Sequence, residues 1–144
     1  MRASVILILL IIFTSVITAT DGKIDKRLHI TSLDIKFDKT DAIFTVNYNF
    51  DKFSETFFLI LGTKTLEPKI RSIFPNFEYD VIKIDQNNAV LRVKNISVLN
   101  KDYYLHTSRK FGDTIDTVYI SDPSNTRIRE YHSINSTPNY FYHS

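Results

Sequence analysis

Three side chains in the second half of the sequence have the chemistry needed for acid–base catalysis: His106, Asp116 and His132. A histidine and a carboxylate within hydrogen-bond reach can activate water, and two histidines with an aspartate can also hold a divalent metal. We expect the strands that carry the histidines to flank a strand at residues 115–120, which would bring the three groups together. A small extracytoplasmic hydrolase that uses these side chains is therefore one hypothesis for the function.

The rest of the sequence favours the interpretation that these histidines lie on a solvated sheet face. The four histidines have no partner at the spacing of a zinc site along one element. Ser108 follows His106 closely, but no glycine-framed turn of the kind that exposes a nucleophilic serine surrounds it. The absence of cysteine excludes thiolate catalysis. We therefore predict no catalytic, metal-binding or cofactor-binding residues and favour a protein that is not an enzyme.

Other ligand classes are disfavoured by composition. Calcium sites need six to eight oxygen ligands, and the paired acidic residues near predicted turns supply too few, so we interpret them as turn chemistry. With only three glycines, the chain cannot build a phosphate-cradling loop, which excludes nucleotides. The net charge of +2 comes from interspersed residues of both signs, and no basic stripe indicates nucleic acid. The pairs near the predicted turns are Asp38 with Asp41, Asp113 with Asp116, and Asp122 with the amide residue Asn125.

Residues 1–20 have the pattern of a signal peptide or an N-terminal membrane anchor. Arg2 precedes an apolar run from residue 3 to residue 19, and no further charge occurs before Asp21. A positive start, a hydrophobic stretch and a small-residue segment match a signal cleaved near Ala19. The run also lies at the short end of the length that spans a bilayer, so an uncleaved anchor is the alternative. Either outcome places the rest of the chain outside the cytoplasm.

Residues 24–134 are long enough for one β-rich globular domain with its own core. Because there are no disulfides, packing alone must stabilise this domain. Residues 135–144 follow as a C-terminal tail whose Tyr140, Phe141 and Tyr142 are more aromatic than a disordered end requires. These rings either dock on the domain's own sheet, which we favour, or insert into a partner or a membrane surface.

Alternation of apolar and polar residues dominates the domain and predicts β-strands. The first hairpin pairs residues 33–37 with residues 44–50 around a turn at 38–41. Leu28 and Ile30 have the opposite phase, so a bulge near residues 31–32 is needed to keep both sets in the core.

One helix is predicted after a buried strand at residues 56–61. Thr65 is expected to cap its first amides, Pro68 suits its first turn, and Pro75 ends it. Because so short a helix is unstable alone, its apolar stripe must pack on a sheet. That stripe consists of Leu66, Ile70, Ile73 and Phe74.

The remaining pattern predicts two more hairpins and a strand at residues 103–110 that turns at residues 111–113. The fold is therefore expected to be α+β, mainly antiparallel sheet with one short amphipathic helix packed on it, preceded by an N-terminal hydrophobic helix. The hairpins pair residues 79–84 with 89–94 and residues 114–121 with 126–132.

Two tripeptides match the acceptor pattern for N-glycosylation, which suits an extracytoplasmic protein. They place the candidate sites at Asn95 and Asn135, and Pro138 directly after the second tripeptide weakens it.

The segment from Phe57 to Phe77, FFLILGTKTLEPKIRSIFPNF, together with the Ile- and Asn-rich hairpins after it, resembles uncharacterised exported, envelope-associated proteins of methanogenic archaea. The resemblance extends over the chain after the leader and contains no catalytic motif. It implies an extracytoplasmic location and no assigned activity.

We therefore expect a secreted or membrane-anchored, non-catalytic binding or structural module of unknown ligand, with no cofactor. Another envelope protein or the membrane surface is the expected partner. The hydrolase is the alternative.

Overall fold

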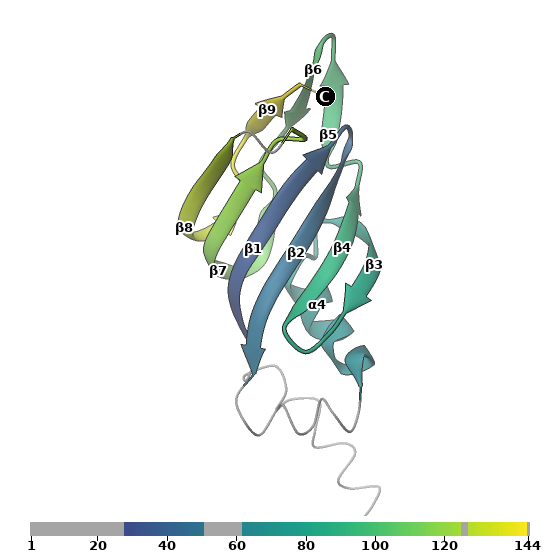
Figure 1. The fold of residues 1–144 in the computed structure, drawn as a ribbon, viewed down its shortest axis with the longest axis vertical. Helices are drawn as coiled ribbons and strands as arrows, with labels where there is room; N and C mark the ends of the chain where they lie inside the picture. Colours follow the sequence, from purple (N-terminus) through teal and green to yellow (C-terminus); the bar gives the residue numbers. More distant parts are fainter. Residues whose placement is uncertain (1–27, 51–61, 125–126, 144) are drawn as a thin grey trace, which may run out of the picture.

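The computed structural model describes residues 28–50, 62–124 and 127–143, which form two β-sheets and one short helix (Figure 1). The predicted N-terminal hydrophobic helix and the predicted strand at residues 56–61 lie outside the described residues. The strands are β1 (Leu28–Asp38), β2 (Asp41–Phe50), β3 (Glu78–Ile84), β4 (Asn88–Lys94), β5 (Ser97–Asn100), β6 (Tyr103–His106), β7 (Lys110–Ser121), β8 (Ile128–Ser136) and β9 (Tyr140–Tyr142).

Six strands form the larger sheet in the order β3-β4-β2-β1-β7-β8. All neighbours are antiparallel except β1 and β7, so the prediction of a mainly antiparallel α+β fold is confirmed. The register of β1 on β2 shifts between Ile30 and Ser32, which confirms the predicted bulge. The bulge keeps Leu28 and Ile30 on the same buried face as the residues after it.

The helix α4 (Glu67–Ile73) follows a 3₁₀ turn, η1 (Thr63–Leu66), and packs on one face of this sheet (Figure 1). Its predicted apolar stripe is buried, and Pro68 lies in its first turn as predicted. The predicted cap is wrong: because the 3₁₀ turn precedes α4, the Thr65 hydroxyl donates to the Gly62 carbonyl at 2.9 Å, and no side chain caps the helix. Within the described ranges, no helix is long and apolar enough to cross a membrane.

The turn predicted at residues 111–113 is also wrong, because these residues lie inside β7. Glycine is instead required at position 112 because α4 packs closely on the strand there. A Cβ atom at this position would lie 1.8 Å from the Ser72 carbonyl oxygen. The neighbouring Phe111 ring stacks on Phe77 at 5.8 Å and meets Phe74 edge-on at 5.9 Å. Glycine therefore permits close contact between strand and helix rather than a change of chain direction.

Three short strands form a second sheet in the order β5-β6-β9, which we call the tip sheet. It attaches to the turn between β1 and β2: the Ile96 and Ser97 amides donate to the Thr40 carbonyl at 2.8 and 3.1 Å. Residues 135–144, predicted as a tail, contribute the end of β8 and all of β9. The favoured prediction that the tail docks on the domain is confirmed for Tyr140 and Tyr142, which are buried.

Candidate binding surface

The predicted acid–base constellation does not form. The neighbours of β7 are β1 and β8, so the expectation that both histidine strands flank it is wrong for His106, which lies in the tip sheet. Asp116 instead contacts His29, with 2.9 Å between carboxylate oxygen and ring nitrogen. His132 is exposed, 3.4 Å from the Glu130 carboxylate. In the described part of the chain, no group of three or more histidine and acidic side chains could hold a metal ion.

His106 has a structural environment. Its ring is buried, and Nδ1 lies 2.8 Å from the Ile96 carbonyl oxygen, which can only accept, so Nδ1 carries a proton. Nε2 lies 2.7 Å from the Thr137 hydroxyl, which also accepts the Arg109 amide at 2.9 Å. In the neutral imidazole Nε2 accepts from that hydroxyl, so the chain of donors and acceptors is complete. Burial lowers the pKa of His106 below its ordinary value.

This environment predicts a loss of stability in mild acid. The folded state disfavours the His106 imidazolium, so around pH 6.5 the unfolded chain binds more protons than the native one. Above that pH His106 does not lower the free energy of unfolding. As the pH falls towards the lowered pKa, the free energy of unfolding decreases, in total by about 1.4 kcal/mol for each unit by which the pKa in the folded state lies below that in the unfolded state. Urea unfolding across this range measures it. His106→Gln should flatten this pH dependence of the free energy of unfolding, and an unaltered slope in His106→Gln would contradict the assignment.

The inner face of the tip sheet is built on one aromatic side chain of β1. Phe37 stacks on Tyr142 at 4.7 Å and on Tyr140 at 5.3 Å, and it contacts His106 at 5.2 Å. The Tyr142 hydroxyl donates to the Lys39 carbonyl at 2.5 Å. Burial raises the pKa of Tyr142 to about 12, so this donor keeps its proton at physiological pH. These contacts therefore attach the tip sheet to the end of the β1–β2 hairpin.

The outer face of the tip sheet carries the feature that requires explanation. Val98 of β5 pairs with Leu105 of β6, and Leu105 pairs with Phe141 of β9. Directly paired residues point to the same face, so these three side chains form a continuous line, here called the apolar row. Their exposed fractions are 70%, 39% and 67%, high for large hydrophobic side chains that lie together.

The apolar row lies at one end of the molecule. Figure 1 shows the tip sheet at the end of β1 that meets the β1–β2 turn, whereas Leu28 begins β1 at the opposite end. Ten residue steps of about 3.3 Å separate Leu28 from Asp38, so the two ends are roughly 33 Å apart. The row therefore lies at the end of the domain opposite the point at which the N-terminal segment joins it.

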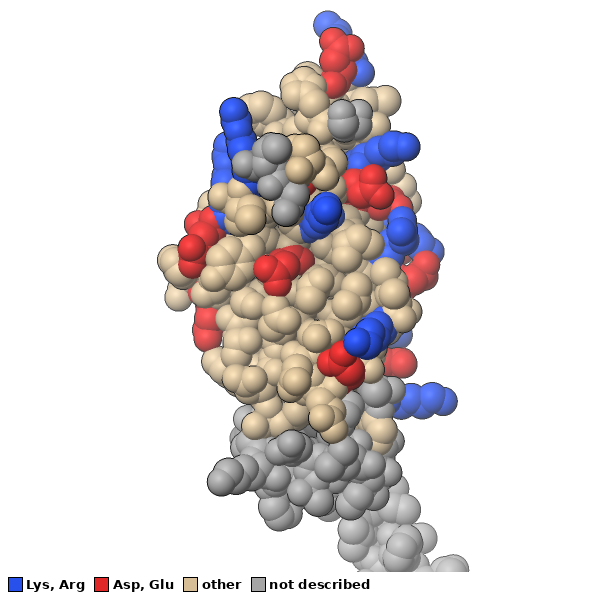
Figure 2. Space-filling view, viewed as in Figure 1, with Lys and Arg blue, Asp and Glu red and all other residues tan. Residues whose placement is uncertain are grey.

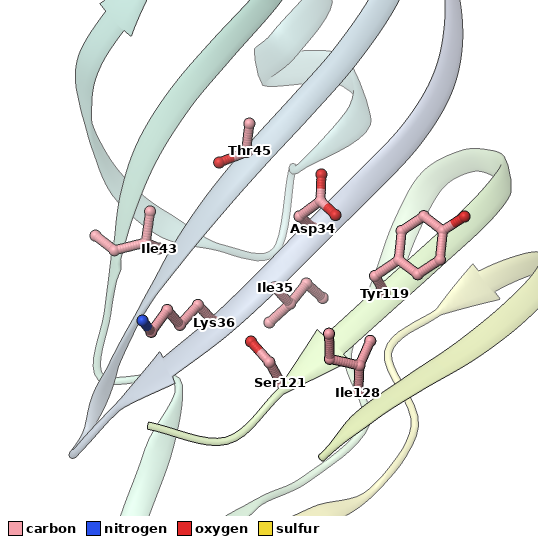
Figure 3. Close-up of a pocket in the computed structure, with 8 residues that line it drawn as sticks. All are labelled: Asp34, Ile35, Lys36, Ile43, Thr45, Tyr119, Ser121 and Ile128. Carbon is pink, nitrogen blue, oxygen red and sulfur yellow. The ribbon is translucent and has the colours of Figure 1, made fainter. Parts of the chain in front are cut away.

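A second surface is an open groove of about 470 Å³ on the face of the six-stranded sheet opposite α4 (Figure 3). Part of its polar lining is already satisfied, because the Asp34 carboxylate accepts the Asn47 side-chain amide at 2.8 Å. Figure 2 shows that this face is mainly uncharged, with isolated charges of both signs. The lining residues are Asp34, Ile35, Lys36, Ile43, Thr45, Tyr119, Ser121 and Ile128.

The polar side chains that line the groove do not converge on a point where a substrate atom could react. Glu130 raises the pKa of the neighbouring Tyr119 hydroxyl, so that phenol stays protonated and is no base. The lining of the groove combines Ile35, Ile43 and Ile128 with polar and charged side chains, whereas all three side chains of the apolar row are hydrophobic and leave their surface in water. No family model, curated protein or solved structure matches the chain. The apolar row is therefore the candidate site, on the basis of its register and exposure alone.

Both candidate glycosylation residues are exposed, whereas the third residue of each tripeptide is buried. Asn95 turns the chain with a φ of 49°, and its carbonyl accepts from the Arg109 guanidinium at 2.8 Å. Ser97 begins β5, and the Thr137 hydroxyl lies 2.7 Å from Nε2 of His106. Each tripeptide therefore has a structural role, and its asparagine remains accessible for modification.

Proposed function

We propose that the protein is a non-catalytic binding module that acts outside the cytoplasm and recognises a partner protein through the apolar row. The single observation that carries this proposal is the in-register exposure of Val98, Leu105 and Phe141 on one face of the tip sheet. Burying these side chains in an interface gains about 25 cal/mol per Å² of apolar surface. Alternation along β9 explains the aromatic tail: Tyr140 and Tyr142 anchor the strand, and Phe141 is left for the partner.

The extracytoplasmic location rests on the N-terminal pattern and on the resemblance to exported proteins. If residues 1–20 remain as an anchor, eight residue steps join Thr20 to Leu28 and span at most about 29 Å. That is less than the roughly 33 Å between Leu28 and the tip sheet. An anchored domain whose β1 strand stands along the membrane normal therefore cannot invert to press the apolar row into its own membrane. This favours an envelope protein over the lipid surface as the partner.

Replacing Phe141 by serine is expected to abolish co-purification of the partner from native membranes while leaving the fold intact. Phe141 is mostly exposed, so the free energy of unfolding should change by no more than about 0.5 kcal/mol. The matched control is Ile82→Ser, which removes a side chain of 55% exposure from β3, outside the tip sheet. Equal recovery of the same partner with Phe141→Ser and with the wild type would overturn the proposal.

The intact mass of the same purified material tests location. Loss of roughly the first twenty residues identifies a cleaved signal, and the full-length mass in membranes identifies an anchor. A glycan on Asn95 or Asn135 adds mass that Asn95→Gln or Asn135→Gln removes. Full-length, unmodified protein recovered in the cytosol would contradict the proposed location.

A further inference from the structure

A pocket of about 400 Å³ lies beside the apolar row, and its lining differs in character from the row itself. It combines the start of β8 and the loop before it with the whole of β9. Phe141 belongs to both surfaces, so the pocket and the row are continuous. The lining residues are Asp122, Ser124, Arg127, Arg129, Tyr140, Phe141, Tyr142 and His143.

Two strands at the margins of their sheets line this pocket. β8 is the last strand of the six-stranded sheet and β9 is the last of the tip sheet, so in the described part of the chain each has a neighbour on one side only. The free side of such a strand presents alternating backbone donors and acceptors, which an added strand can satisfy. Extended peptides are recognised in this way, with the backbone giving affinity and alternate side chains giving specificity.

The charge of the pocket is positive. Arg127 and Arg129 face one carboxylate, Asp122, which also accepts the Ser124 hydroxyl at 3.0 Å. The Arg129 guanidinium lies over the Tyr140 ring, 5.2 Å from its centre, which holds it at the pocket wall with its edge groups accessible to a ligand. Guanidinium groups bind carboxylates with strong, directional hydrogen bonds.

We propose that this pocket binds an extended acidic segment of the partner protein, with carboxylates at alternate residues meeting Arg127 and Arg129. The two arginines are themselves two residues apart. In extended chains such residues lie on one side at about 6.6 Å spacing, so a segment with acidic residues at alternate positions matches them. An apolar residue beside that segment then contacts Phe141. The inference rests on the proposed function, because it identifies what the tip sheet recognises.

The test uses the full chain, or its mature form, and a blocked synthetic peptide, Ser-Glu-Val-Glu-Val-Ser, followed by amide chemical shifts of the labelled protein. Shifts should concentrate in β8 and β9. The glutamine counterpart of the peptide should bind at least about tenfold more weakly, because two charge-assisted contacts are lost. The double variant Arg127→Gln, Arg129→Gln should show the same loss, whereas Arg92→Gln, an exposed arginine on β4, should bind as the wild type does.

Equal binding of both peptides, or no binding by the wild type, would overturn the inference. Binding to phosphatidylglycerol vesicles but not to the acidic peptide would assign the pocket to lipid, and concentration-dependent sedimentation that the double variant abolishes would assign it to a second copy of the chain. Either result would overturn it too. If the peptide fails while Phe141→Ser still loses the partner, only the acidic-segment inference falls. If both fail, the proposed function falls with it.

Discussion

Replacing Gly112 by alanine is expected to lower the free energy of unfolding by about 3 kcal/mol, because the added methyl group collides with the backbone of α4. The new Cβ would lie 1.8 Å from the Ser72 carbonyl oxygen and 3.0 Å from its carbonyl carbon. Both are backbone atoms of α4, so the contact cannot be relieved by a side-chain rotation. Helix and strand must separate, which opens the core around Phe111. Urea unfolding of the purified variant measures the change.

Gly62→Ala is the matched control for the loss of glycine itself. Gly62 has a φ of 77°, and no atom lies within 4 Å of the position its Cβ would take. With a ψ of −178°, this backbone conformation is one that almost only glycine adopts, so the replacement should cost backbone strain alone, on the order of 2 kcal/mol. If Gly112→Ala proved no more harmful than Gly62→Ala, the close packing of β7 against α4 would be incorrect.

Tyr142→Ala is expected to destabilise the protein by about 4 kcal/mol, because it removes a buried ring from the junction of the two sheets. The substitution loses stacking on Phe37 and Tyr104 and the hydrogen bond to the Lys39 carbonyl. It should also release β9, the last strand of the tip sheet. Thermal unfolding, with near-ultraviolet circular dichroism to follow the tyrosines, reports both effects.

The neighbouring substitution Phe141→Ala separates anchoring from recognition. Phe141 points to the opposite face of the same strand and is 67% exposed, so its loss should change stability by less than about 0.5 kcal/mol. Equal destabilisation by the two substitutions would mean that the alternation of β9 is misassigned. Unfolding of both variants under identical conditions decides the point.

The sequence predicted the elements whose patterns are long and local. The β1–β2 hairpin, its bulge and the stripe of α4 follow from periodicity over seven or more residues, which the structure bears out. The turn prediction at Gly112 is wrong because the close contact of Gly112 with Ser72 joins residues forty positions apart in the sequence. Local composition cannot distinguish these two uses of glycine.

The candidate site was only partly predictable. The aromatic tail indicated docking, but which ring remains exposed depends on the register of β9 on β6. The strand β5 has four residues, too few for periodicity to identify, so Val98 gave no signal. The prediction that His106 lies close to Asp116 is wrong, because the sheet to which a strand belongs depends on pairing between residues far apart in the sequence.

Photocrosslinking tests the central claim, recognition through the apolar row, most directly. A photoreactive phenylalanine analogue in place of Phe141 should, on illumination of cells that produce the full chain, form one discrete protein adduct. The additional change Leu105→Ser should abolish that adduct, and the same analogue in place of Ile82 should not form it. An adduct of equal yield from position 82, or lipid as the only species attached at position 141, would contradict the account.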